Sequence, residues 1–348
     1  MSNQVQIRVG VIGLGRLWEA RHKPAFAKMR DRFQVTTVYD QVLRRAEIEA
    51  RQLGCDAVES LNALVNRADV DAIYLLTPQW FGLHPIELAC KAGKPVYCAL
   101  PLAGSRSELE PAAKMVEQSG ILFMPEFARR IYPATVRLRE LLTSTLGPPR
   151  LILGHSRLFG FDRYGSPGPT TQLTPAPLMI DPGSYLLDWC NYLFQSSPTA
   201  VQGSKSLTLS EAESTPPAQV GPDFESFIAE YEGGAMAQIS LGRYHRKAWG
   251  EATKFLPPPG YQVYSERGMA LVELPDRIQW SDSLGTHEER LPLEPSLGEV
   301  LNDQFYRLLR EDHTLAPSIQ DALAVSRRID DIQTSQREGT KIIPPPAN

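Results

Sequence analysis

Two glycines near the N-terminus are the first residues of this chain whose spacing suggests a binding site. An apolar run over residues 7–12 ends at Gly13, and Gly15 follows two residues later. Glycine has no Cβ, so Gly13 permits a tight turn and Gly15 lets a ligand approach the backbone closely. Arg16 and Leu17 then start a segment with helical spacing, and a helix N-terminus offers free N–H groups to a phosphate. The spacing therefore predicts a strand, a glycine turn and a helix that together can hold a phosphate group.

A carboxylate further along the chain extends this pattern. Trp18 occupies the place of the third glycine of G-x-G-x-x-G, so the glycine pair alone fits an ordinary strand-to-helix turn as well as a dinucleotide site. Asp40 follows the apolar run VTTVY, where a carboxylate can accept the ribose hydroxyls of an adenosine; as an alternative, it caps the next helix. Arg44 and Arg45 on that helix are either solvated charges or partners of a 2′-phosphate. The combination favours a nucleotide site and leaves both NAD and NADP open as the cofactor.

Composition narrows the kind of partner. The 348 residues are 42% hydrophobic and 22% charged, with a formal net charge of −4, which is typical of a globular protein with room for two domains. No basic stripe is present to bind nucleic acid or an anionic membrane, so the expected ligand is a small-molecule substrate. The four cysteines and six histidines lack metal-ligand spacing, so we expect neither a metal site nor a disulfide framework. The absence of a leader, and of any apolar run near the roughly 18 residues of a membrane span, predicts a cytoplasmic protein.

The candidate residues need strands to position them. From residue 7 to about residue 125, short apolar runs alternate with helical segments, which predicts βαβ units and a Rossmann-type, doubly wound parallel sheet. The expected helices cover 43–53, 60–66, 84–93 and 106–119, and the expected strands include 34–39, 69–78, 94–101 and 121–125. Ligands of such sheets bind beyond the carboxyl ends of the strands. Besides the glycine turn and Asp40, these ends contain Thr77, Pro78, Leu100 and Pro101.

The pattern changes after residue 127. Short strands joined directly by turns replace the alternation, which predicts an α+β domain with an open, mainly antiparallel sheet. The expected strands cover 150–161, 199–209, 223–231, 235–243, 261–265, 269–274 and 277–281, and the expected helices cover 132–146, 181–194, 296–310 and 318–335. We therefore expect an NAD(P)-binding domain over 1–127 and a substrate and oligomerisation domain over 128–348, whose last helices pack back on the first domain.

The order of several short motifs resembles the Gfo/Idh/MocA family, which includes glucose-fructose oxidoreductase and inositol dehydrogenase. The motifs are VGVIGLG, Asp40, DVDAIYLLTP followed by His84, AGKPVYC, FARRIYPA, DPGSYLLD and DALAVSRRIDDIQTSQREG. The resemblance runs nearly end to end, and it implies a homodimer or homotetramer assembled through the C-terminal sheet. It also implies hydride transfer between NAD or NADP and a hydroxyl or carbonyl carbon of a sugar, polyol or related small molecule. A contact between His84 and the cofactor rests on this resemblance alone.

The chain differs from the family at the positions of the family's catalytic lysine and histidine. Members carry Glu-Lys-Pro after the fifth strand, and the lysine can hydrogen-bond the reacting oxygen; here Ala99-Leu100-Pro101 stands in that place. Members also carry an aspartate, a glycine two residues on and, after two more, a histidine that carries the proton. This chain has Asp181, Gly183 and Tyr185 instead. Sugar-alcohol oxidation by the family route is therefore not expected, since removing one positioned donor costs roughly 10² to 10³ in rate.

Three functions stay open at this point. In the first, Asp181 and Tyr185 serve a different NAD(P)-dependent oxidoreduction, with Tyr185 as the acid or with a self-activated substrate; biliverdin reductases resemble the family and also lack the lysine. In the second, the protein binds NAD(P) as a sensor or scaffold without turnover. In the third, the cofactor takes part only transiently in an elimination or a glycoside cleavage. The purely structural alternatives are that Asp181 is a helix N-cap and that Tyr185 is a packed core residue.

Overall fold

The computed structural model describes residues 6–76, 81–99, 102, 106–159, 178–206, 224–244, 260–310 and 316–345. The chain forms two compact units, each assembled from two stretches of sequence. The first unit contains residues 1–131 and 293–326, and the second contains residues 132–292 and 327–348. Helix α10 (Ile319–Glu338) begins in the first unit and ends in the second. Neither unit is therefore a single continuous piece of the chain.

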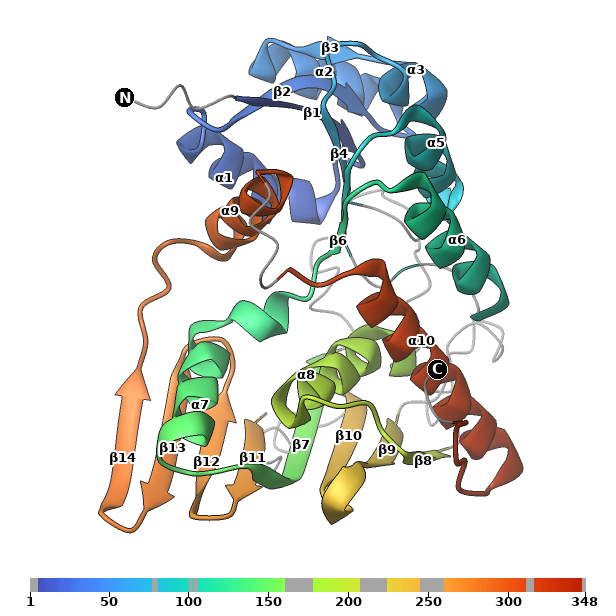
Figure 1. Cartoon of the computed structure of the whole chain (residues 1–348). Helices are drawn as coiled ribbons and strands as arrows, with labels where there is room; N and C mark the ends of the chain where they lie inside the picture. Colours follow the sequence, from blue (N-terminus) through green and yellow to red (C-terminus); the bar gives the residue numbers. More distant parts are fainter. Residues whose placement is uncertain are drawn as a thin grey trace. The chain divides into compact units, whose positions relative to one another are not determined.

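The first unit contains a parallel sheet of six strands in the order β3-β2-β1-β4-β5-β6 (Figure 1). The strands are β1 (Ile7–Ile12), β2 (Phe33–Tyr39), β3 (Asp56–Ala57), β4 (Ala72–Leu75), β5 (Val96–Cys98) and β6 (Phe123–Pro125). The strand order reverses between β1 and β4, and the crevice at such a switch point is where ligands of open α/β sheets bind. The predicted Rossmann sheet is confirmed.

Helices cover both faces of this sheet, because each face of a parallel sheet is apolar and must be buried. One face packs against the helical turn η1 (Trp18–His22) and against α1 (Lys23–Lys28), α2 (Leu43–Leu53) and α9 (Leu297–Leu309). The other face packs against α3 (Leu61–Val65), α5 (His84–Ala92), α6 (Arg106–Ser119) and the start of α10. A short 3₁₀ helix, η2 (Ala128–Ile131), follows β6.

Aromatic side chains fill the core between the first sheet and α9. Tyr74 of β4 and Tyr97 of β5 stack with ring centroids 4.7 Å apart. Phe305 of α9 meets both rings edge-on, at 5.4 and 5.6 Å. Phe26 of α1 contacts Tyr74 at 4.9 Å. A helix from late in the sequence therefore completes the core of the first unit.

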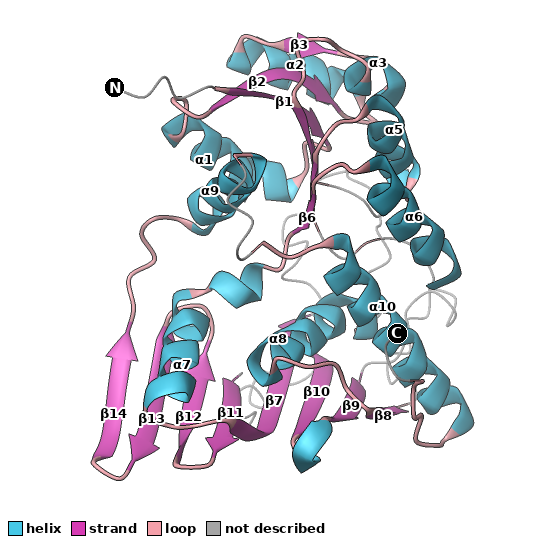
Figure 2. Cartoon of the chain, viewed as in Figure 1, coloured by secondary structure: helices cyan, strands magenta, loops and turns pink. Residues whose placement is uncertain are grey.

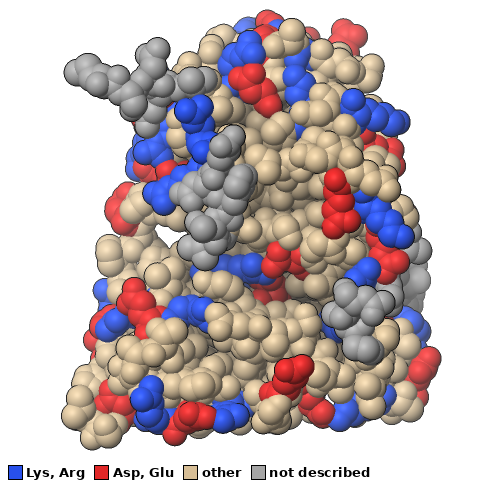
Figure 3. All heavy atoms as spheres, viewed as in Figure 1, with Lys and Arg blue, Asp and Glu red and all other residues tan. Residues whose placement is uncertain are grey.

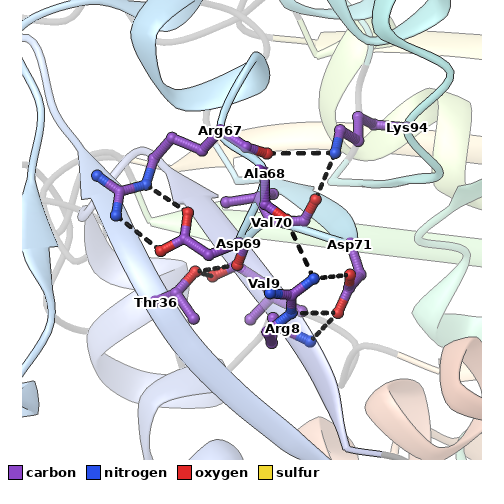
Figure 4. Close-up of polar contacts among 9 residues, drawn as sticks. All are labelled: Arg8, Val9, Thr36, Arg67, Ala68, Asp69, Val70, Asp71 and Lys94. Atoms are coloured by element: carbon purple, nitrogen blue, oxygen red, sulfur yellow. Dashed lines mark hydrogen bonds and ion pairs between the residues drawn. The ribbon is translucent and has the colours of Figure 1, made fainter.

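The amino-terminal ends of the strands are tied together by charged side chains (Figure 4). Arg8 of β1 donates to the two carboxylate oxygens of Asp71 at 3.0 and 2.7 Å. Arg67 pairs with Asp69 at 2.7 Å. Hydrogen bonds from these arginines lower the pKa of Asp71 and of Asp69. Because ligands of such sheets bind at the opposite, carboxyl ends, we interpret this cluster as part of the scaffold.

The second unit contains an open sheet of eight strands in the order β14-β13-β12-β11-β7-β10-β9-β8 (Figure 2). The strands are β7 (Pro149–Phe159), β8 (Ala200–Lys205), β9 (Phe224–Glu230), β10 (Met236–Tyr244), β11 (Gly260–Ser265), β12 (Gly268–Glu273), β13 (Arg277–Asp282) and β14 (Gly285–Arg290). Neighbouring strands are antiparallel except β7 and β10, which are parallel. The predicted open, mainly antiparallel sheet is confirmed.

Two helices, α7 (Pro133–Ser144) and α8 (Ser184–Phe194), pack against this second sheet. Trp189 of α8 is buried and donates its Nε1–H to Thr135 Oγ1 of α7 at 2.9 Å. A π-helical turn, η3 (Met179–Gly183), precedes α8, and a short 3₁₀ turn, η5 (Glu232–Gly234), connects β9 to β10. The sheet and its two helices therefore form a separate core.

Basic and acidic side chains are mixed on the face of the molecule drawn in Figure 3. On the face drawn in Figure 3, Lys and Arg alternate with Asp and Glu, in keeping with 36 basic and 40 acidic residues in the whole chain. Among the described residues, no group of three or more His, Cys, Asp or Glu side chains is arranged to hold a metal ion. None of the helices in the described ranges is long and apolar enough to cross a membrane.

Candidate nucleotide-binding site

The glycine turn follows β1 at the switch point of the first sheet. Gly13 has a φ of 93°, which residues with a Cβ rarely adopt, and its N–H donates to Tyr39 O at 2.9 Å. Gly13 is buried, Gly15 is partly exposed, and Arg16 and Leu17 start the helical segment. The turn offers backbone without side chains at the carboxyl end of a strand. This geometry fits the pyrophosphate of a dinucleotide.

Trp18 stands in the place of a third glycine and lies in a widened helical turn. The π-helical turn η1 runs from Trp18 to His22, and α1 follows it. The indole is fully buried and donates its Nε1–H to Glu49 Oε1 of α2 at 3.0 Å. Lys23 Nζ donates to the other oxygen of Glu49 at 2.9 Å. A third glycine allows a helix to pack closely on its strand; here the indole fills that space and links the helix to α2.

Asp40 lies directly after β2, with 6% of its surface exposed. Its Oδ2 accepts from Leu14 N–H in the glycine turn at 3.0 Å, and its Oδ1 accepts from Val42 N–H at 2.9 Å. Arg45 of α2 donates to the two oxygens at 3.2 and 3.3 Å. The N-cap residue of α2 is Val42, and no side chain caps that helix, so the alternative that Asp40 is an N-cap is wrong. Asp40 instead ties the end of β2 to the glycine turn.

An open groove of about 420 Å³ runs between α2 and the η1–α1 segment. Its walls include Arg44 and Arg45 from α2, and Glu19 and Lys23 from the facing segment. Lys23 lies 3.7 Å from Glu19 and 2.9 Å from Glu49, which also lines the groove. Because Arg45 belongs to both the groove and the Asp40 ion pair, the groove borders the residues proposed to bind a nucleotide.

A buried carboxylate that the sequence patterns did not reveal follows β6. Glu126 is 3% exposed, and Tyr97 donates its O–H to Glu126 Oε2 at 2.8 Å. His22 Nε2 lies 3.4 Å from the same oxygen, and Arg21 forms an ion pair with Oε1. His22 Nδ1 lies 3.1 Å from Asn302 Oδ1 of α9. This cluster connects the helix after the glycine turn to β5, to β6 and to α9.

The electrostatics of this cluster keep Glu126 ionised. Burial raises the pKa of the carboxyl, but the hydrogen bond from His22 and the charge of Arg21 outweigh burial, so the pKa lies below its ordinary value. Burial and the charge of Glu126 raise the pKa of Tyr97, which keeps the phenol protonated as a donor. No sequence pattern indicated this cluster, since Arg21 and His22 precede Glu126 by 105 and 104 residues.

The remaining cofactor candidates are placed only in part. His84 begins α5, its side chain is 61% exposed, and its Nδ1 lies 3.6 Å from Glu87 Oε2. Ala99 is buried after β5, and its N–H donates to Leu75 O at 2.9 Å. The candidates outside the described residues are Thr77, Pro78, Leu100 and Pro101. The roles of all these residues toward a cofactor stay predictions.

The two catalytic candidates belong to the second unit. Asp181 has non-helical φ and ψ of −145° and 107° at a kink directly before Pro182, so both the catalytic role and the helix-capping role of this residue stay predictions. Tyr185 lies in the first turn of α8 and is partly exposed, whereas Leu186 and Trp189 are fully buried. Tyr185 is therefore not one of the fully buried residues of α8. Its catalytic role stays a prediction.

Comparison with known proteins relates the first unit to a family. Residues 7–127 match the family GFO_IDH_MocA, described as "Oxidoreductase family, NAD-binding Rossmann fold". The chain is 30% identical to 2,7-anhydro-N-acetylneuraminate hydratase from Escherichia coli K12 over 136 residues, which is 39% of this chain and 36% of that protein. It is 27% identical to scyllo-inositol 2-dehydrogenase (NAD(+)) from Bacillus subtilis 168 over 200 residues, 57% of each protein. The chain thus spans between 36% and 57% of the length of these two curated relatives.

Among solved structures, aldose-aldose oxidoreductase from Caulobacter crescentus, complexed with glycerol, has the same fold. The TM-score is 0.81 at 18% sequence identity, with 98% of this chain and 100% of that chain covered. The family match and the NAD(+)-dependent relative confirm the prediction of NAD or NADP as the cofactor. Over residues 7–127, where the Rossmann sheet is observed, the chain therefore matches the Gfo/Idh/MocA oxidoreductase family.

Proposed function

We propose that this protein is an NAD(P)-dependent oxidoreductase that acts on a hydroxyl or carbonyl carbon of a small, sugar-like molecule. The observation that carries the proposal is the pairing of the glycine turn with Asp40, whose Oδ2 accepts from Leu14 N–H at 3.0 Å. This arrangement stands at the carboxyl ends of β1 and β2, where dinucleotides bind in sheets of this type. The inositol dehydrogenase and aldose oxidoreductase among its relatives support a polyhydroxylated substrate.

The residues of the first unit are assigned to the cofactor. Gly13 and Gly15 leave room for the pyrophosphate, and Asp40 with Arg45 faces the adenosine ribose. The further residues assigned to the cofactor are Arg16, Leu17, Thr77, Pro78, His84, Leu100 and Pro101. A bound nicotinamide supplies or accepts the hydride. Leu100, an alkyl side chain, can pack against an apolar ring but cannot donate a hydrogen bond to the reacting oxygen.

The residues of the second unit are assigned to the substrate. Tyr185 donates its phenolic proton to the substrate oxygen while the carbonyl carbon gains the hydride, and it takes the proton back in the reverse direction. Asp181, four residues earlier in the chain, helps to orient the substrate. This mechanism uses neither the lysine nor the histidine typical of the family. It therefore suits a substrate whose carbonyl is already electrophilic.

The proposal also covers the oligomeric state of the protein and its cellular location. Partly exposed apolar side chains on the second sheet, such as Leu151, Leu153 and Leu271, support a homodimer or homotetramer that forms through this sheet. We place the protein in the cytoplasm. Analytical ultracentrifugation tests the assembly: a monomer at micromolar concentration would contradict it.

Calorimetry and kinetics test the function. The protein should bind at least one of NAD⁺, NADH, NADP⁺ and NADPH, and oxidise the reduced form in the presence of sugar carbonyl compounds. Tyr185→Phe should lower kcat far more than nucleotide affinity. Tyr192→Phe, on the same helix, is the matched control and should leave kcat unchanged. If none of the four nucleotides binds, or if Tyr185→Phe turns over like the wild type, the corresponding part of the proposal is wrong.

A second candidate function follows from Leu100. Because this position lacks the family lysine, a protein that binds the nucleotide as a sensor or scaffold, without turnover, also fits the sequence. In that case bound NADH or NADPH stays reduced against the whole substrate panel. A net elimination or hydrolysis, in which the cofactor is regenerated within one turnover, would instead release product with no net change in absorbance at the reduced-nicotinamide band.

A further inference from the structure

The carboxylate of Asp40 is already engaged by groups of its own chain. It accepts from Leu14 N–H at 3.0 Å, from Val42 N–H at 2.9 Å and from Arg45 Nη1 at 3.2 and 3.3 Å. A carboxylate offers about four acceptor positions. The two hydroxyls of an unphosphorylated adenosine ribose need two of them. An NAD ribose must therefore compete with Arg45 for Asp40.

The first turn of α2 carries more positive than negative charge beside this position. Arg45 holds its ion pair with Asp40 while 44% of its side chain stays exposed. Arg44, the preceding residue, is exposed and lines the same groove. Within the described part of the chain, Arg44 has no carboxylate partner. Two guanidinium groups therefore line the groove, and one of them, that of Arg45, is bound to the buried carboxylate of Asp40.

The other charged groups of the groove are paired among themselves. Lys23 lies 2.9 Å from Glu49 and 3.7 Å from Glu19. Glu49 also accepts from the indole N–H of Trp18 at 3.0 Å, which fixes it on the η1 side of the groove. Lys23 thus compensates only one of these two carboxylates, so the net charge of the groove is balanced by Arg44, which forms no ion pair among the described residues.

We infer that Arg44 and Arg45 bind the 2′-phosphate of NADP(H), and that the protein prefers NADP(H) to NAD(H). Arg45 neutralises Asp40, so a phosphate beside this carboxylate meets a guanidinium rather than a bare negative charge. Arg44 supplies a second planar set of donors, the geometry that suits a phosphate. The inference rests on the proposed function, because it specifies the cofactor of the same nucleotide site.

Titration calorimetry with NADP⁺ and NAD⁺ tests this preference without turnover. The wild type should bind NADP⁺ at least about tenfold more tightly, the factor expected for one charge-assisted hydrogen bond. Arg44→Ala and Arg45→Ala should each weaken NADP⁺ binding about tenfold. The affinity for NAD⁺ should be unchanged in Arg44→Ala, and unchanged or raised in Arg45→Ala. Arg51→Ala, an exposed arginine later on α2 whose Nε donates to Glu47 O, is the matched control and should leave both affinities unchanged.

Fragments separate the phosphate from the rest of the cofactor. The protein should bind 2′,5′-ADP more tightly than 5′-AMP, and Arg45→Ala should abolish the difference. If NAD⁺ binds as tightly as NADP⁺, or if both arginine variants keep the wild-type preference, the inference is wrong while the nucleotide function stands. If neither dinucleotide binds, the proposed function fails and the inference fails with it.

Discussion

Tyr97 donates its phenolic hydrogen to Glu126 Oε2 across 2.8 Å, inside the core of the first unit. Tyr97→Phe removes a hydrogen bond to a buried charged acceptor and should lower the free energy of unfolding by about 1.5–3 kcal/mol. The control lies next to it. Tyr74 stacks on Tyr97 at 4.7 Å, and its buried hydroxyl has no hydrogen-bond partner among the described residues. Tyr74→Phe should therefore lower the free energy of unfolding by less than Tyr97→Phe does. Urea unfolding measures both losses of stability, and equal losses would contradict a stabilising hydrogen bond from Tyr97 to Glu126.

The charge of Glu126 should make stability depend on pH in the acidic range. The pKa of Glu126 in the folded protein lies below its ordinary value of 4.5, so its stabilisation is complete above that value and is lost as the pH falls through the folded pKa. At pH 7, Glu126→Gln leaves Arg21 beside a neutral buried amide and should cost about 3–5 kcal/mol. Thermal unfolding should show this gap between wild type and variant narrowing below pH 4.5. A gap that is constant from pH 7 to pH 3 would show that the carboxylate charge does not stabilise the fold.

Replacing Trp18 by glycine restores the complete glycine pattern but should damage the protein. The indole is fully buried and bonded to Glu49, so Trp18→Gly leaves a cavity and should cost about 3–5 kcal/mol. Trp18→Phe keeps a ring in the space and loses only the N–H bond, with an expected cost of about 1–3 kcal/mol. Chemical denaturation of both variants measures the two effects. Wild-type stability in Trp18→Gly would mean that the indole does not support the helix after the turn.

The thiols should be unreactive in the folded protein. Burial raises the pKa of Cys98 and of Cys90, and it raises the pKa of Cys55 to about 11. Since the thiolate is the reactive form, iodoacetamide at pH 8 should modify the native protein slowly, beginning at the half-buried Cys55. Mass spectrometry before and after unfolding in urea provides the comparison. Rapid modification of native Cys98 would contradict its burial.

Much of the fold could be predicted because hydrophobic periodicity is local. The helix expected over 106–119 is α6 with the same bounds, and the alternation of strands and helices predicted the parallel sheet. Strand β14 escaped prediction because GTHEER has no apolar alternation; it forms by pairing with β13. The Glu126 cluster escaped because its members are brought together only by tertiary structure. The same is true of the Arg45–Asp40 ion pair.

The dependence of the first unit on α9 has a consequence for synthesis on the ribosome. Phe305 packs against Tyr74 and Tyr97, yet residues 132–292 of the other unit are translated before α9. At about 5–20 residues per second, this interval lasts roughly 10–30 s. Through that time the nascent nucleotide-binding sheet presents two stacked aromatic rings without their cover. The second unit cannot cover this interval by folding first, because its residues 327–348 are translated after α9.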